Sequence, residues 1–192
     1  LNDVATAGIT LDTLEADANV ILTAAGNTAI TNDAALALQG AVTGTLAATA
    51  TTGGITDSSN LSATGNVTLN DVATAGITLD TLEADANVIL TAAGNTAITN
   101  DAALALQGAV TGTLAATATT GGITDSSNLS ATGNVTLNDV ATAGITLDTL
   151  EADANVILTA AGNTAITNDA ALALQGAVTV SYTHLTLPTK QP

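Results

Sequence analysis

The chain has 192 residues, of which 46% are hydrophobic, 9% charged and 1% aromatic, and its 17 acidic and one basic residues give a net charge of -16. A single basic residue leaves no basic patch, which excludes nucleic-acid binding and polybasic membrane contact. The absence of cysteine excludes disulfides and thiolate metal sites, and no apolar run approaches the ~20 residues of a membrane-spanning helix.

Tandem copies of one 68-residue unit account for this composition. Residues 1–68 and 69–136 are identical, and a partial third copy occupies residues 137–179. We expect these three parts to form one continuous domain. Because the sequence begins at Leu1 without Met, we also expect it to be a fragment of a longer protein.

Short apolar segments separated by Gly, Asn, Asp and Ser run through the unit, a pattern typical of strands and turns. Three of them contain Ile-Thr: GITLD (8–12), AITND (29–33) and GITDS (54–58). The apolar segments before these are NVTL (66–69), NVIL (19–22) and TLAA (45–48), and those after them are LEA (14–16), LAL (36–38) and LSA (61–63). The nine segments predict three coils of three strands each, over residues 66–86, 19–44 and 45–65.

This organisation predicts an all-β fold, a parallel β-solenoid of about eight coils with three coils per repeat. Alternation of side chains along each strand predicts one inward Ile column and one outward Thr column. The Ile column is Ile9, Ile30, Ile55, Ile77, Ile98, Ile123, Ile145 and Ile166, and the Thr column is Thr10, Thr31, Thr56, Thr78, Thr99, Thr124, Thr146 and Thr167. The surplus of the longest coil, QGAVTG at 39–44 and 107–112, is expected to protrude as a loop.

Two other structures are compatible with parts of the sequence. DTLE (12–15) fits a helical capping box, and DAALALQG (33–40) fits an Asp-capped helical turn that ends at Gly40. The low complexity of the repeat is also compatible with disorder. Recurrent Thr, Val, Ile and Asn at equivalent places in the unit favour strands over both.

Asp12, Asp33 and Asp57, next to the Ile-Thr segments, are the side chains in the unit most suited to chemistry. A pair of carboxylates can act as acid and base, but residues 1–179 contain no Lys, Arg, His or aromatic residue to assist them. We therefore predict no enzyme, no catalytic residue and no cofactor, and interpret these Asp residues as solvated corners.

Weak calcium binding at the same three Asp residues is the one metal hypothesis, because carboxylates are suitable oxygen ligands although EF-hand and G-G-x-G-x-D motifs are absent. The Thr column also suggests ice binding, because ice-binding solenoids carry regular rows of hydroxyl groups. Such proteins usually have a Thr-x-Thr pattern, whereas here Thr10 is followed two residues later by Asp12.

Residues 180–192 differ from everything before them. They contain the only Tyr, His and Lys of the chain and both Pro residues. VSYTHLTLPT (180–189) resembles a translated sequencing adapter, which implies a non-native tail, and the alternative is a divergent terminal strand. We therefore exclude the tail from functional arguments.

NVTLNDVATAGITL, NVILTAAGNTAITN and GGITDSSNLSATGNVTL, from residues 1–179, resemble the β-strand repeats of giant secreted bacterial adhesins. These include filamentous-haemagglutinin-like exoproteins and autotransporter passenger domains. The resemblance implies a right-handed β-helix that is exported through an outer-membrane pore and displayed at the bacterial surface as a structural stalk. Any host or cell-surface ligand would then be bound by regions outside this chain, and the edges of the solenoid are expected to favour self-association. The alternatives are an extracellular enzyme or ligand-binding solenoid whose active part lies elsewhere, and a phage or surface-layer fibre.

Overall fold

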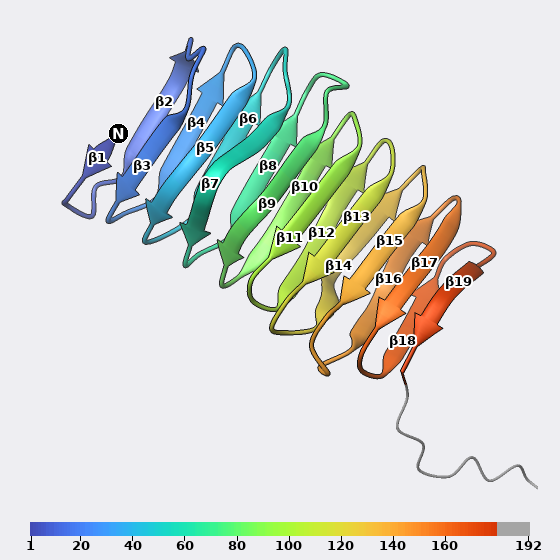
Figure 1. The fold of residues 1–192 in the computed structure, drawn as a ribbon. Coiled ribbons are helices and arrows are strands. Elements are labelled where there is room, and N and C mark those ends of the chain that lie inside the picture. Colours follow the sequence, from blue (N-terminus) through green and yellow to red (C-terminus); the bar gives the residue numbers. More distant parts are fainter. Residues whose placement is uncertain (180–192) are drawn as a thin grey trace, which may run out of the picture.

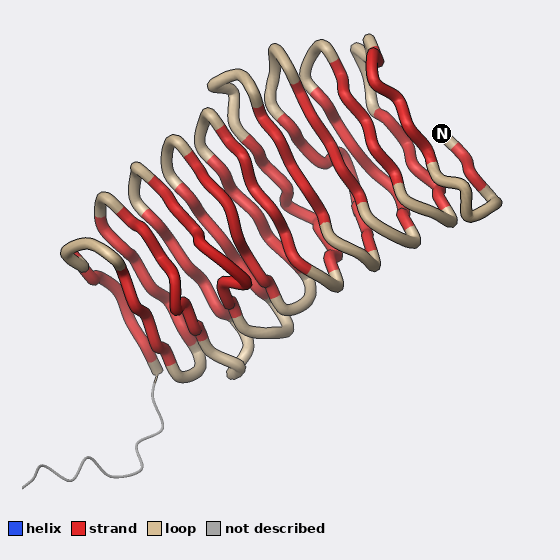
Figure 2. The backbone as a smooth tube through the Cα atoms, turned by 180° about the vertical axis from the view of Figure 1, so that it is seen from behind, coloured by secondary structure: helices blue, strands red, loops and turns tan. Residues whose placement is uncertain are grey.

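The computed structural model describes residues 1–179, which form strands and turns without any helix (Figure 2). The strands belong to two parallel sheets. Sheet A contains the odd-numbered strands β1 (Asn2–Asp3), β3 (Val20–Ala24), β5 (Leu36–Val42), β7 (Ile55–Ala63), β9 (Ile77–Ala84), β11 (Thr96–Asn100), β13 (Leu114–Ala118), β15 (Val135–Asp139), β17 (Asn155–Ala160) and β19 (Ala173–Val178). Sheet B contains the even-numbered strands β2 (Ile9–Leu14), β4 (Thr28–Asn32), β6 (Leu46–Ala50), β8 (Val67–Asp71), β10 (Asn87–Ala92), β12 (Leu104–Val110), β14 (Ile123–Ala131), β16 (Ile145–Ala152) and β18 (Thr164–Asn168).

Successive strands alternate between the two sheets, so each coil consists of one strand in each sheet (Figure 1). About nine coils stack along the axis, which confirms the predicted parallel β-solenoid and its approximate coil number. The helical and disordered alternatives are wrong, because residues 12–14 lie in β2 and residues 36–40 in β5. Strands prevail there because the backbone pairs with neighbouring coils while Leu36 and Leu38 point to the same buried face. The non-native tail predicted for residues 180–192 lies outside the described residues.

The number of coils per repeat differs from the expected three. Val20 begins β3, and Val88, its equivalent in the next copy, belongs to β10, so one repeat spans seven strands. With two strands in each coil, seven strands make three and a half coils. Equivalent residues in successive copies therefore lie in opposite sheets. The coil boundaries predicted at 66–86, 19–44 and 45–65 and the three strands per coil are wrong.

Two pairs of predicted segments are each joined into one strand, which explains the difference. GITLD and LEA form the single strand β9 in the second copy, and GITDS and LSA form β14. Both strands contain residues that shift the pairing register, between Leu79 and Leu82 and between Thr124 and Leu129. These are β-bulges, where extra residues interrupt the pairing without ending the strand. The nine predicted segments thus become seven strands.

The core lies between the sheets and contains only Leu, Ile, Val and Ala as apolar side chains. Ile55 and Ile77 are fully buried and stack directly, as do Ile123 and Ile145. The predicted inward direction of Ile is confirmed, but the single Ile column is wrong, because its members are divided between the sheets. The Thr residues beside them point outward and are exposed or half-buried, again on both faces rather than in one column.

The loops predicted at residues 39–44 and 107–112 are not present. Residues 39–42 belong to β5 and 107–110 to β12. Gly40 and Gly108 adopt φ angles of 109° and 111°, which only Gly tolerates readily. The Cβ of any other residue at position 108 would lie 2.0 Å from the carbonyl oxygen of Leu90. The residues that have no pairing partner lie in the facing strands instead. They form exposed bulges at residues 58–60 of β7 and 126–128 of β14.

Candidate functional site

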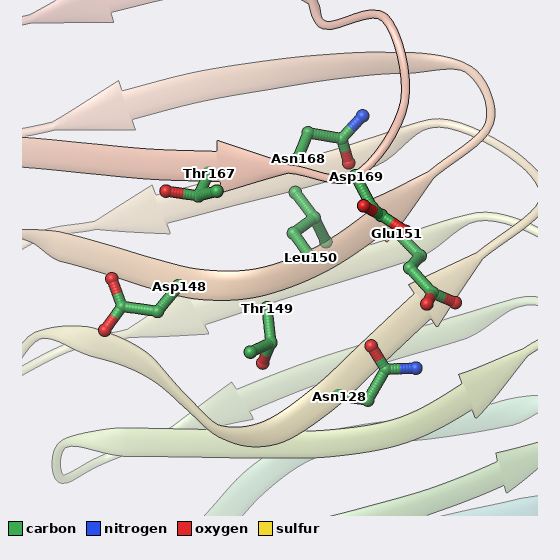
Figure 3. Close-up of a pocket in the computed structure, with 8 residues that line it drawn as sticks. All are labelled: Asn128, Asp148, Thr149, Leu150, Glu151, Thr167, Asn168 and Asp169. Carbon is green, nitrogen blue, oxygen red and sulfur yellow. The ribbon is translucent and has the colours of Figure 1, made fainter.

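The same acidic groove occurs in each copy of the repeat, beside the bulge of the ITLDTLEA strand. In the third copy, Asn128, Asp148, Thr149, Leu150, Glu151, Thr167, Asn168 and Asp169 line it (Figure 3). The second copy has a groove lined by Asn60, Asp80, Thr81, Leu82, Glu83, Thr99, Asp101 and Thr119, and the first has one lined by Asp12, Thr13, Glu15, Thr31, Asp33 and Thr51. Their volumes are about 290, 240 and 300 Å³.

Successive grooves open on opposite faces of the solenoid. The first and third copies form them on β2 and β16 of sheet B, whereas the second forms its groove on β9 of sheet A. The cause is the odd number of strands per repeat. A partner that recognised this groove would therefore find it on both sides of the rod.

An Asp of the preceding coil binds the bulge of β9 and the bulge of β16. The Asp57 carboxylate accepts bonds from the backbone nitrogens of Asp80 (2.9 Å) and Thr81 (2.6 Å) and from the Thr81 hydroxyl (2.9 Å). Asp125 accepts the equivalent bonds from Asp148 and Thr149. These bonds occupy the carboxylate oxygens, so the structure gives Asp57 and Asp125 a structural role in shaping the groove.

The three Asp residues considered as a weak calcium site do not come together. Asp12 and Asp33 line the same groove on sheet B, but Asp57 lies on β7 in sheet A. Asp33 accepts a 2.7 Å bond from the Thr51 hydroxyl of the next coil. Residues 1–179 hold no group of three or more His, Asp or Glu side chains arranged to bind a metal ion.

The groove's chemistry is limited to carboxylates, amides and hydroxyls. Figure 3 shows the carboxylates of Asp148 and Glu151 at opposite ends of the groove. Because residues 1–179 contain no Lys, Arg or His, no cationic side chain lies beside these carboxylates. The described groove can thus offer acceptors to a cation or a polyhydroxylated molecule, but it provides no positive group to stabilise a developing negative charge.

A buried Asn that the sequence patterns did not single out closes one turn in the first and second copies. Asn100 is fully buried, and its Oδ1 accepts a 2.7 Å bond from the Ala84 nitrogen. Its Nδ2 donates to the carbonyl oxygens of Ala84 (3.1 Å) and Ala103 (2.8 Å). Asn32 makes the same three bonds in the first copy. The available signal was the alternation in AITND, which places Asn on the inward face together with Ile.

A buried carboxylate closes a second recurrent turn. Asp71 and Asp139 are each 1% exposed, and each accepts a bond from the backbone nitrogen of the Gly five residues later, at 2.8 and 2.9 Å. Asp3 makes the equivalent bond to Gly8 at 2.9 Å. The side chain therefore fixes the NDVATAG turn, and its position inside the rod keeps it away from the acidic groove.

Comparisons with known proteins place the chain in a family without assigning an activity. No helix in residues 1–179 has the length and apolar character needed to cross a membrane. No curated protein and no solved structure matches the chain. Residues 25–93 and 93–160 each match the family described as "Repeats of unknown function (DUF5649)", and the starts of the two matches differ by the 68-residue period seen in the sequence. Because these matches cover more than half of its residues, the chain belongs to this family of repeats.

Proposed function

We propose that this chain is a structural spacer, a stalk segment of a large secreted or surface-displayed bacterial adhesin, with no catalysis of its own. The observation that carries the proposal is the unbroken parallel pairing of identical copies from one end of the described chain to the other. In a solenoid, each added repeat buries its inward face against its neighbours and extends the rod. Identical copies add length without adding new surface chemistry, which suits a spacer better than a single specific site.

Composition and sequence resemblance support the same proposal. The chain is acidic and has no cysteine, and its repeats resemble the β-strand repeats of bacterial exoproteins. We propose an extracellular or outer-surface location on this basis. Its test is to raise an antibody against the repeat and to probe intact and permeabilised cells of the source organism. Signal only after permeabilisation would contradict surface display.

The spacer role is tested by changing the number of repeats. Variants with one, two and four additional complete 68-residue units would be measured by small-angle X-ray scattering and by binding to cells and glycan arrays. At a strand spacing of about 4.8 Å, three and a half coils should lengthen the rod by about 17 Å per unit. We expect length to rise linearly and binding to stay at background.

Two results would contradict the spacer role. Length that does not increase by a constant amount per unit would show that the copies do not stack as one rod. Affinity for one ligand that rises with every added unit would make the repeat itself the binding surface, and the acidic groove would then be its first candidate. Substituting Glu83 and Asp101 by Gln and Asn would distinguish groove binding from binding elsewhere on the rod.

A further inference from the structure

Each complete repeat contains two Asn-x-Ser/Thr motifs, the sequence at which asparagine accepts N-linked sugar. One is Asn60-Leu61-Ser62 and the other is Asn66-Val67-Thr68. The second copy repeats them at residues 128–130 and 134–136. The motif alone does not decide modification, because a transferase must also reach the asparagine. The structure separates the two motifs on this criterion.

Asn60 lies where strand β7 is least constrained by its neighbours. It is the last of the three bulge residues, and its side chain is exposed. The pairing of β7 with β5 lapses between Asp57 and Leu61, and its pairing with β9 lapses between Thr56 and Leu61. Within residues 1–179, Asn60 therefore has no partner in the register of either neighbouring strand. An enzyme can thus reach this residue without separating two coils.

The serine of this motif lies on the same outward face as the asparagine. Leu61 between them is fully buried, so the alternation of side chains along the strand directs Asn60 and Ser62 away from the core. The amide that reacts and the hydroxyl that completes the motif are therefore presented together. Residues 128–130 repeat this arrangement on β14, beside the third-copy groove (Figure 3).

The second motif is held in place by both neighbouring coils. Asn66 is half-buried in the turn before β8, and its Oδ1 accepts a 3.3 Å bond from the Asn87 nitrogen. Its carbonyl oxygen accepts a 2.9 Å bond from the Leu46 nitrogen. The Oδ1 of Asn134 accepts the equivalent bond from the Asn155 nitrogen at 3.2 Å. These bonds must break before a transferase can draw this amide into its active site.

We propose that Asn60 and Asn128, in the bulges of β7 and β14, are acceptor sites for N-linked sugar on the folded rod. The amides of the second motif stay unmodified. The donor is a sugar whose anomeric carbon is bonded to a diphosphate, which either a nucleotide or a lipid carries. The asparagine Nδ2 forms a bond to that carbon while the bond from the carbon to the diphosphate oxygen breaks. The diphosphate leaves with the electron pair, and a base of the transferase takes the proton that Nδ2 loses.

A sugar at these positions covers the acidic grooves. Asn60 lines the groove of the second copy, and Asn128 lines that of the third. Because β7 lies in sheet A and β14 in sheet B, the sugars stand on both faces of the rod. The inference stands independently of the proposed spacer role, because it depends only on which amides a transferase can reach.

Glycosylation of the folded chain in vitro tests the proposal. One arm uses an N-glycosyltransferase with a nucleotide sugar, and the other an oligosaccharyltransferase with a lipid-linked donor. We expect intact-mass spectrometry to show one glycan at Asn60 and one at Asn128, and the arm that gives them identifies the carrier of the donor. The peptides around these two residues have the same sequence, so Ser62→Ala and Ser130→Ala assign them. Each variant should lose one glycan, and the double variant should lose both.

The second motif and an unfolded peptide provide the controls. Thr68→Val with Thr136→Val removes the second motif from both copies and should leave the glycan number unchanged. A synthetic peptide of residues 53–69 carries both motifs without the rod, and both of its asparagines should be modified. Equal modification of Asn60 and Asn66 in the folded chain would overturn the proposal, because exposure would then not select the site.

Two further results would also overturn it. A folded rod that stays unmodified while the peptide is modified would show that the bulge is closed to the enzyme. A peptide that neither enzyme modifies, although both enzymes act on their standard acceptor peptides, would show that this motif is not an acceptor.

Discussion

Thr78 and Thr146 occupy the same position of the repeat, yet they lie on opposite faces of the rod. Thr78 is on β9 in sheet A and Thr146 is on β16 in sheet B, and both side chains are exposed. The sequence around them is identical. The difference arises because seven strands separate them and each strand changes sheet. The rod therefore presents every repeated surface on both of its faces.

This alternation predicts where labels on equivalent residues will lie. Thr10, the first-copy equivalent, is on β2, seven strand spacings from β16 in the same sheet. Spin labels on Thr10→Cys and Thr146→Cys should therefore be about 34 Å apart. Biotin on the same pair should place two streptavidin molecules on one side of the rod in electron micrographs. Labels at Thr78→Cys and Thr146→Cys should lie on opposite sides, and finding both pairs on the same side would contradict an odd number of strands.

Removing the buried amide of Asn100 should destabilise the second copy strongly. Asn100→Ala leaves the Ala84 nitrogen and the carbonyl oxygens of Ala84 and Ala103 without their side-chain partner. A buried polar group that loses its hydrogen bond costs about 1–3 kcal/mol, so we expect a loss of about 3 kcal/mol in the free energy of unfolding. Urea titration followed by circular dichroism measures it. The control is Asn138→Ala on the outward face of β15, and equal losses from both variants would contradict the structural role of Asn100.

Thr96 offers a stabilising substitution. Its hydroxyl is buried and has no hydrogen-bond partner within the described chain. It lies in an inward column between Ile77 and Leu114, so a methyl group would have apolar neighbours. Because an unpaired buried hydroxyl costs about 1–3 kcal/mol, Thr96→Val should raise the free energy of unfolding by about 1 kcal/mol. Thr99→Val on the outward face should leave it nearly unchanged, and a loss of stability in Thr96→Val would indicate a partner for the hydroxyl, such as a buried water.

Gly108 should not tolerate a side chain. Its φ angle of 111° and the 2.0 Å approach of an added Cβ to the Leu90 oxygen both oppose substitution. A non-Gly residue held in such a backbone conformation costs about 1–3 kcal/mol, to which the clash adds. Gly108→Ala should therefore lower the thermal midpoint clearly. Ala109→Gly, on the outward side of the same strand, should cost only about 0.5–1 kcal/mol. A smaller loss in Gly108→Ala than in Ala109→Gly would mean that the strand does not make this kink.

Local patterns determined the class of fold. The alternation of Leu36, Ala37 and Leu38 identifies an inward and an outward face, because successive side chains of a strand point in opposite directions. The 68-residue period in turn indicates stacking, since one coil cannot bury its inward face alone. These properties depend on neighbours along the chain or on the repeat itself. The sequence alone therefore predicted parallel strands stacked as a solenoid and the inward direction of Ile55 and Ile77, both of which the structure confirms.

Contacts between coils decided the rest. Whether ITLD and TLEA form two strands or one depends on the bulge at Asp80 and Thr81, whose backbone nitrogens are bound by Asp57 from the preceding coil. That contact spans more than twenty residues and has no local signature. The two joined pairs leave seven strands in a repeat, and their alternation between only two sheets decides the face on which every later residue lies. The alternating acidic grooves follow from this arrangement of seven strands in two sheets, so only the stacked coils reveal them.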